Sequence, residues 1–176
     1  EDAPIAHELR IMAEEKDIES VIKRVCKVIT SDKVGGKVNK TCGVHVHLDM
    51  RQITRNKELI FNNLVNCQGL LFSLVPKSRR SNKYCNFVAN SNYHDSNGHH
   101  HDAISGRDAY AKHKTFEVRI HSGTLNASKI NYWINLLLLI TNNNTTMVPI
   151  TGLTEFEKAL TTPLSEDLKS YIKKRV

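Results

Sequence analysis

Two short segments of this sequence, residues 44–49 (VHVHLD) and 115–121 (TFEVRIH), alternate strictly between apolar and polar residues. The polar positions are His45, His47 and Asp49 in the first segment, and Glu117, Arg119 and His121 in the second. Successive side chains of a β-strand point to opposite faces, so each segment predicts a half-buried strand with one polar face. We therefore expect the working surface of the protein to be built on these two strands.

The remaining pattern predicts a mixture of helices and short extended pieces. We expect a helix from Asp17 to about Ile29 and a second over 56–74 ended by Pro76. A third should start at Asn126 or Ser128 and be closed by the asparagines at 142–144. Two short helices follow, the first begun by a Thr154–Glu157 capping box and the second capped by Ser165. Between the second and the third helix we expect an extended piece over 84–89 and a long polar loop over 90–107, which is a candidate mobile lid. Because strands and helices do not alternate regularly, the prediction is one α+β domain over residues 1–176.

Charge and cysteine content narrow the function classes. The net charge is +7 and the pI is about 9.3, which favours anionic partners, although spread-out lysines and arginines also suit a solubilising surface. Four cysteines at wide, irregular spacing make a zinc ribbon unlikely and favour a reducing cytoplasm. The densest apolar run, 130–140, is too short to span a bilayer. The sequence begins with Glu1 rather than Met, so it leaves N-terminal targeting open.

The polar faces of the two strands carry the strongest chemical signals. Two neutral imidazoles and a carboxylate on one rigid strand suit a divalent metal or a phosphate, and the alternative is a plain solvent-facing side. On the second strand Glu117 and Arg119 together can hold a metal and an anionic oxygen, or they can form ordinary cross-strand surface pairs.

Two further segments are weaker candidates. The segment PKSRR contains Arg79 and Arg80, whose planar guanidinium groups bind phosphate or carboxylate, although a solvated basic turn would look the same. The histidine-rich stretch 94–102 offers possible ligands for a transition metal, but a polar loop is the simpler interpretation.

Taken in order, CGVHVHLD, a helix, PKSRR, KTFEVRIHSGTLN and a further helix resemble the amidoligase family, distant relatives of glutamine synthetase. The resemblance covers about residues 3–140 and leaves 141–176 outside it. It implies a curved, mainly antiparallel sheet flanked by helices, with ATP and Mg²⁺ on its concave face. It also implies an ATP-dependent ligase that joins a small-molecule or peptide carboxylate to an amine through an acyl phosphate.

The resemblance also implies roles for individual residues. The metal ligands would be His45, Glu117 and, through a looser match, Glu8. The phosphates of the nucleotide would lie beside His47. The catalytic cations would be Arg79, Arg80 and Arg119, and of these Arg79 and Arg119 would also contact the nucleotide. Family members usually begin with a strand of paired glutamates, which this sequence lacks, so we expect weak Mg²⁺–ATP binding and poor turnover from these 176 residues alone.

Two other functions remain open at this point. A metal-dependent phosphoesterase or nuclease would use His45, His47 and Asp49 to activate water, with the basic charge holding nucleic acid. A non-catalytic ligase-fold module that binds a partner is the third. The sequence favours no membrane partner, leaves nucleic acid unlikely but open, and does not indicate the substrates or the oligomeric state.

Overall fold

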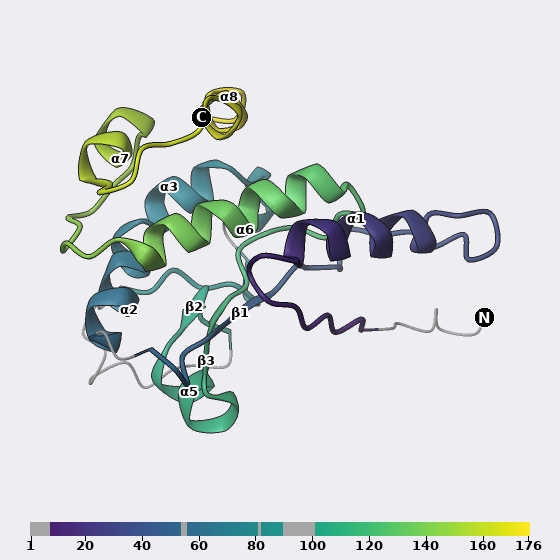
Figure 1. The fold of residues 1–176 in the computed structure, drawn as a ribbon, viewed down its shortest axis with the longest axis horizontal. Helices are drawn as coiled ribbons and strands as arrows, with labels where there is room; N and C mark the ends of the chain where they lie inside the picture. The colour runs from purple at the N-terminus through teal and green to yellow at the C-terminus, as the bar shows by residue number, and fades with distance from the viewer. Residues whose placement is uncertain (1–7, 54–55, 81, 90–100) are drawn as a thin grey trace.

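The computed structural model describes residues 8–53, 56–80, 82–89 and 101–176 (Figure 1). In chain order the elements are α1 (Ile18–Ile29), β1 (Val46–Asp49), α2 (Lys57–Asn66), α3 (Gln68–Ser73), α4 (Lys77–Arg80), β2 (Ile104–Ser105), α5 (Arg107–His113), β3 (Thr115–Val118), α6 (Ala127–Asn142), α7 (Leu153–Ala159) and α8 (Glu166–Lys173). This mixture of helices with a small sheet confirms the α+β fold class.

The sheet is antiparallel, with the strand order β1-β3-β2. Both predicted strands are present, and they are direct neighbours. Their apolar partners Leu48 and Phe116 are both buried on the core side. Pairing continues beyond the strands, because Val44 donates its N–H to the carbonyl of His121 over 3.1 Å. The polar positions of both strands therefore share the face away from the core.

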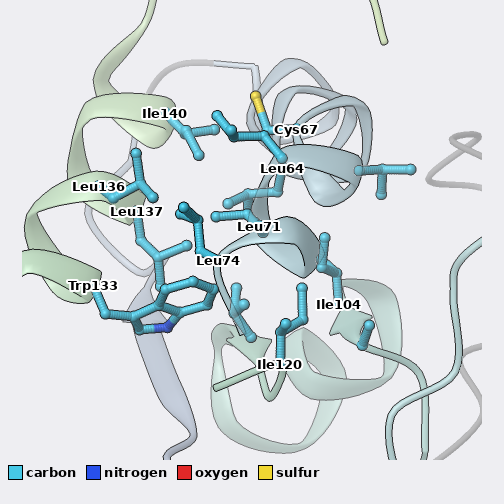
Figure 2. Close-up of a cluster of buried hydrophobic side chains, with 14 of the residues drawn as sticks. Leu64, Cys67, Leu71, Leu74, Ile104, Ile120, Trp133, Leu136, Leu137 and Ile140 are labelled. Atoms are coloured by element: carbon cyan, nitrogen blue, oxygen red, sulfur yellow. The ribbon is translucent and has the colours of Figure 1, made fainter. Parts of the chain in front are cut away.

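The core lies between this sheet and the helices, and α6 forms one side of the cluster drawn in Figure 2. The residues of α6 that face it are Trp133, Leu136, Leu137 and Ile140, and those of α2, α3 and the turn after α3 are Leu64, Cys67, Leu71 and Leu74. Each fully buried side chain of this size contributes about 1.5–3 kcal/mol. A smaller cluster attaches α1 to α6 through Ile22, Cys26, Ile130 and Ile134. In the described part of the chain, no helix is both long and apolar enough to cross a membrane.

The single helix predicted over 56–74 is wrong in one respect, because it is divided into α2 and α3 at Cys67. The C-terminal segment enters the helical hydrogen-bond ladder at this point. Ile150 donates its N–H to the Asn66 carbonyl over 2.8 Å, and its own carbonyl accepts the N–H of Leu70 over 3.1 Å. A tertiary contact thus replaces helical bonds, which periodicity within the helix cannot reveal.

The segment that follows α4 and contains β2 and α5 also differs from the prediction. Residues 84–89 form no regular strand and are held by single bridges, such as Asn86 with Asp102. Residues 90–100, with most of the histidine-rich stretch and of the predicted lid, lie outside the described residues. The rest of the predicted loop contains β2 and leads into α5, because both pack on β3.

The cap predicted for the first C-terminal helix lies two residues too late, because the observed N-cap is Gly152 and not Thr154. Glu155, not Glu157, reaches back to accept the backbone N–H groups of Thr151 (3.1 Å) and Gly152 (3.3 Å). Glu157 instead pairs with Lys169 of α8. The predicted Ser165 cap is confirmed, since its hydroxyl accepts the N–H of Leu168.

Candidate functional site

Strands β1 and β3 together assemble a compact group that we call the Glu117 cluster: Glu117, His45, His47 and Arg119. One carboxylate oxygen, Oε1 of Glu117, is its centre. This oxygen lies 2.8 Å from Arg119 Nη2, 3.1 Å from His45 Nδ1 and 3.8 Å from His47 Nε2. The cross-strand register makes His47 the direct partner of Glu117. His45 comes directly before β1, and Arg119 comes directly after β3. The sequence alternation therefore brings both predicted polar faces to one place.

Burial sets the electrostatics of this cluster. The side chains of Glu117 and Arg119 are only 13% and 8% exposed, whereas the two histidines are more than two-fifths exposed. Burial by itself would raise the pKa of Glu117, but the hydrogen bond from His45 and the charge of Arg119 outweigh it and lower that pKa to about 2. The cluster thus holds a permanent carboxylate under a rim of imidazoles.

His47 is oriented by a second set of contacts. Its Nδ1 lies 3.0 Å from the Thr115 hydroxyl, which leaves Nε2 directed at Glu117. Its ring meets that of His113 edge-on, with the centroids 6.0 Å apart. Desolvation lowers the pKa of His47 against the opposing effect of Glu117, and His113 lowers it further.

His113 is a member of this neighbourhood that the sequence pattern did not single out. It ends α5, and the chain then reverses through Lys114, which has a left-handed φ of 59°. That turn places His113 beside β1 although it lies outside the alternating pattern. A non-glycine residue in this conformation leaves no clear trace in the sequence.

Two predicted acids take positions outside the Glu117 cluster. Asp49 binds its neighbour Arg51 through both carboxylate oxygens, at distances down to 2.6 Å. Glu8 is exposed and pairs with Arg10 over 2.9 Å. Arg10 is the main cause of the lowered pKa of Glu8, and His45 and His47 also lower it. Glu8 thus lies within the electrostatic reach of the cluster without contacting it.

Arg79 lies behind the Glu117 cluster, and its donors face the backbone. Its guanidinium donates to the carbonyls of Arg119 (2.8 Å), Ile120 (3.3 Å) and His121 (3.4 Å), and the residue is buried. A Cβ added to Gly43 would lie 3.2 Å from both Arg79 Nη2 and His45 Nε2, so Gly43 permits this close approach. In this structure Arg79 fastens the chain after β3 instead of pointing into the cluster.

Arg80 lies elsewhere. It is exposed and donates to the carbonyls of Ser73 (2.7 Å) and Val75 (3.0 Å) at the end of α3. These carbonyls have no helical partners at a helix C-terminus, so an arginine there acts as a cap. The structure does not bring Arg80 to the Glu117 cluster.

His121 leaves the polar face that it was expected to share with Glu117 and Arg119. The ring is buried against Trp133, with the centroids 5.0 Å apart, and Nδ1 lies 2.7 Å from the Ser122 carbonyl. The regular strand β3 ends at Val118, and although the His121 carbonyl still accepts the Val44 N–H, the alternation of faces is not maintained at residue 121. Burial lowers the pKa of His121.

The described residues do not make a Mg²⁺ site by themselves. Mg²⁺ prefers several oxygen ligands in octahedral geometry. The cluster offers one carboxylate, Glu117, and both Arg119 and His45 already bind its Oε1. Among the described residues, no group of three or more His, Cys, Asp or Glu side chains is arranged to hold a metal ion.

The same cluster is better suited to an anion. Nε of Arg119 is buried and has no hydrogen-bond partner among the described residues. A buried guanidinium with an unused donor gains from an oxyanion within reach. The imidazoles of His45 and His47 on the rim can donate to the same ligand or move a proton.

We compared the whole chain with known proteins. No protein-family model matches it, and neither the curated proteins nor the solved structures contain a match. The function is therefore inferred from the residues of this chain and from their geometry.

Proposed function

We propose that this chain is an ATP-dependent carboxylate–amine ligase of the amidoligase type, with a sheet like that of the glutamine synthetase catalytic domain. One observation carries the proposal: the Glu117 carboxylate is held by His45 and Arg119 across two neighbouring antiparallel strands. These are the residues to which the amidoligase resemblance gives roles in phosphate and metal handling.

The chemistry would run in two steps. The substrate carboxylate attacks the γ-phosphate of ATP, which gives an acyl phosphate and ADP, and an amine then displaces phosphate to form the amide. Phosphoryl transfer depends mostly on positioning and on neutralising charge. We assign that neutralisation to Arg119, hydrogen-bond donation to the phosphate oxygens to the imidazoles of His45 and His47, and the positioning of Arg119 and His45 to Glu117.

Two earlier assignments change in this proposal. Arg79 becomes a positioning residue, because it bonds the backbone of the segment that carries Arg119. Arg80 loses its assigned role, because it caps α3. Since the described residues do not fit Mg²⁺ alone, no step is assigned to the metal. Glu117, His45 and Glu8 can take their expected roles as Mg²⁺ ligands only if further oxygen donors come from outside the described residues. All four cysteines are free, which suits the reducing cytoplasm that we propose as its location.

Hydroxylamine offers a direct test, because it traps acyl phosphates as hydroxamates, which form a coloured complex with added iron(III). The chain, alone and in the form its gene encodes, is incubated with ATP, Mg²⁺, hydroxylamine and a panel of carboxylic acids. We expect acid-dependent ADP release with hydroxamate formation that Glu117→Gln or Arg119→Lys reduces at least about 100-fold. Glu166→Gln, an exposed acid on α8, is the matched control and should leave both rates unchanged.

The outcomes separate the three functions. Metal-dependent cleavage of phosphodiesters without ATP would establish the phosphoesterase or nuclease instead. Absence of ATP binding and of hydroxamate across the panel, in both forms of the protein, would leave a non-catalytic binding module.

A further inference from the structure

A second polar region of the molecule lies between α6 and α8, away from the Glu117 cluster. Two adjoining cavities of about 320 Å³ and 450 Å³ occur there, and Lys129 and Arg175 line both of them. The larger cavity also takes in residues 121–124, which connect β3 to α6. We call the two cavities together the basic cleft.

The basic cleft has a strong excess of positive charge. Its cationic residues are Lys77, Arg80, Lys129, Lys174 and Arg175, and its one acidic residue is Asp167. Among the described residues, none of these five cations has a carboxylate within ion-pair distance. The charges of Lys129 and Arg175 both reach the buried His121 and help to lower its pKa. Clustered cations without counter-charges repel one another, and a bound anion relieves that repulsion.

Several groups in the cleft are held in place. The guanidinium of Arg175 lies 3.7 Å above the ring of Tyr171 and donates from Nη1 to the Tyr171 carbonyl over 2.9 Å. Tyr171 is only 5% exposed, and its hydroxyl has no hydrogen-bond partner among the described residues. A buried hydroxyl without a partner costs free energy, which a ligand oxygen in the cavity can recover.

The N-terminus of α6 adds to this field. Asn126 caps the helix by accepting the N–H of Lys129 over 3.0 Å, and both Asn126 and Ser128 line the smaller cavity. The sixteen-residue helix directs the positive end of its dipole to this point. The helix dipole and the side chain of Lys129 therefore both favour an anionic ligand.

The basic cleft is separate from the Glu117 cluster. The two share no residue, and α6 lies between α8 and the sheet in Figure 1. Part of the cleft is built by α8, which belongs to the segment outside the amidoligase resemblance. An interpretation of the cleft therefore does not depend on the proposed ligase activity.

We propose that the basic cleft binds a small molecule that carries two or more phosphate groups. Both cavities have the size typical of small-molecule sites. Cations are present at each end, with Lys77 and Arg80 lining only the larger cavity and Lys174 only the smaller. A single phosphate or carboxylate could not meet both ends, whereas a polyphosphate chain presents charged oxygens along its length.

Isothermal titration with tripolyphosphate tests the proposal on the whole chain, with citrate as a polycarboxylate and a single-stranded oligonucleotide as further ligands. We expect saturable binding of tripolyphosphate, with citrate weaker by at least about tenfold. Lys129→Gln removes one exposed cation with little risk to folding and should weaken tripolyphosphate about tenfold. Lys129→Gln combined with Lys174→Gln should weaken it further.

One matched variant serves as the control. Lys173→Gln removes an exposed α8 charge outside the cleft and should change the Kd less than about twofold. Weakening by Lys129→Gln and not by Lys173→Gln assigns the binding to the basic cleft, because Lys129 does not belong to the Glu117 cluster. The proposal is overturned if tripolyphosphate does not bind, or if Lys129→Gln and Lys173→Gln weaken it equally. Much tighter, Lys129-dependent binding of the oligonucleotide would also overturn it, since the phosphates would then come from nucleic acid.

Discussion

His47 and Glu117 are direct partners across the antiparallel pair β1–β3, and both side chains lie on the face away from the core. This register places His45 and Arg119, two residues before His47 and two after Glu117, against the same carboxylate oxygen. A slip of one residue would turn either polar set into the core. The buried pair Leu48–Phe116 on the opposite face therefore fixes the site as well as the sheet.

Removing the charge of Glu117 should destabilise the fold. Glu117→Gln leaves the guanidinium of Arg119 buried beside a neutral amide, and breaking a buried ion pair costs roughly 3 kcal/mol. Urea denaturation at pH 7 measures this. The control Glu19→Gln breaks an exposed pair with Lys23 and should cost less than about 0.5 kcal/mol. Equal losses from the two substitutions would contradict a buried pair at Glu117.

The stabilisation by Glu117 should disappear in acid. Its pKa is lowered from 4.5 to about 2 in the folded chain, so the unfolded chain takes up a proton first as the pH falls. The contribution is complete above about pH 4.5 and is lost progressively toward pH 2. We expect the difference in unfolding free energy between the wild type and Glu117→Gln to shrink as urea titrations move from pH 5 to pH 3. A difference that stays constant over this range would contradict the lowered pKa.

His121 should make stability pH-dependent nearer neutrality. Burial lowers its pKa below the ordinary value of 6.5, so below pH 6.5 the unfolded chain binds more protons and the unfolding free energy falls. His121→Phe keeps an aromatic ring against Trp133 but cannot titrate. At pH 7 we expect the unfolding free energy of this variant to be about 1 kcal/mol lower than that of the wild type, because the hydrogen bond to Ser122 is gone. Between pH 7 and pH 5 we expect its unfolding free energy to fall by less than that of the wild type. Equal losses in that interval would contradict the role given to His121.

Local alternation was sufficient to predict the two strands and the meeting of His45, His47, Glu117 and Arg119. It was not sufficient for His121, because the regular strand ends at Val118. The backbone still pairs with Val44 at His121, so pairing alone does not preserve the alternation of faces, and nothing within the sequence of 115–121 marks the end of the regular strand.

Features that depend on distant contacts were also missed. The break between α2 and α3 follows from Ile150, which is about 80 residues away along the chain. The role of Arg79 depends on carbonyls that become accessible only after the chain leaves β3. A guanidinium can donate hydrogen bonds to a phosphate or to a backbone carbonyl, so the residue type alone could not decide between the two partners.

Arg79 and Arg80 should differ sharply in their contribution to stability. Arg79→Met fills similar space but removes the guanidinium donor from the Arg119 and Ile120 carbonyls, whereas the His121 carbonyl keeps the N–H of Val44; the loss should cost at least about 2 kcal/mol. Arg80→Met removes an exposed cap and should cost less than about 1 kcal/mol. Thermal and urea unfolding of both variants measures the contrast. A neutral Arg79→Met variant with weakened ATP binding would restore the phosphate role that the sequence suggested.

Gly106 should tolerate no side chain, because it lies directly on the aromatic core. A Cβ there would come within 2.5 Å of the ring of Phe61, which is fully buried and meets Phe116 of β3 edge-on. The ring has no free space to move into, so Gly106→Ala should cost about 1–3 kcal/mol by overpacking. Gly152 is the matched control, since the nearest atom to its Cβ would be the Glu155 carboxylate at 4.0 Å. Gly152 is the N-cap of α7, where Ala is less favourable than Gly, so Gly152→Ala should cost less than about 1 kcal/mol and involve no steric clash. Urea denaturation compares the two, and a neutral Gly106→Ala variant would show that β2 and α5 do not pack on Phe61 as closely as described.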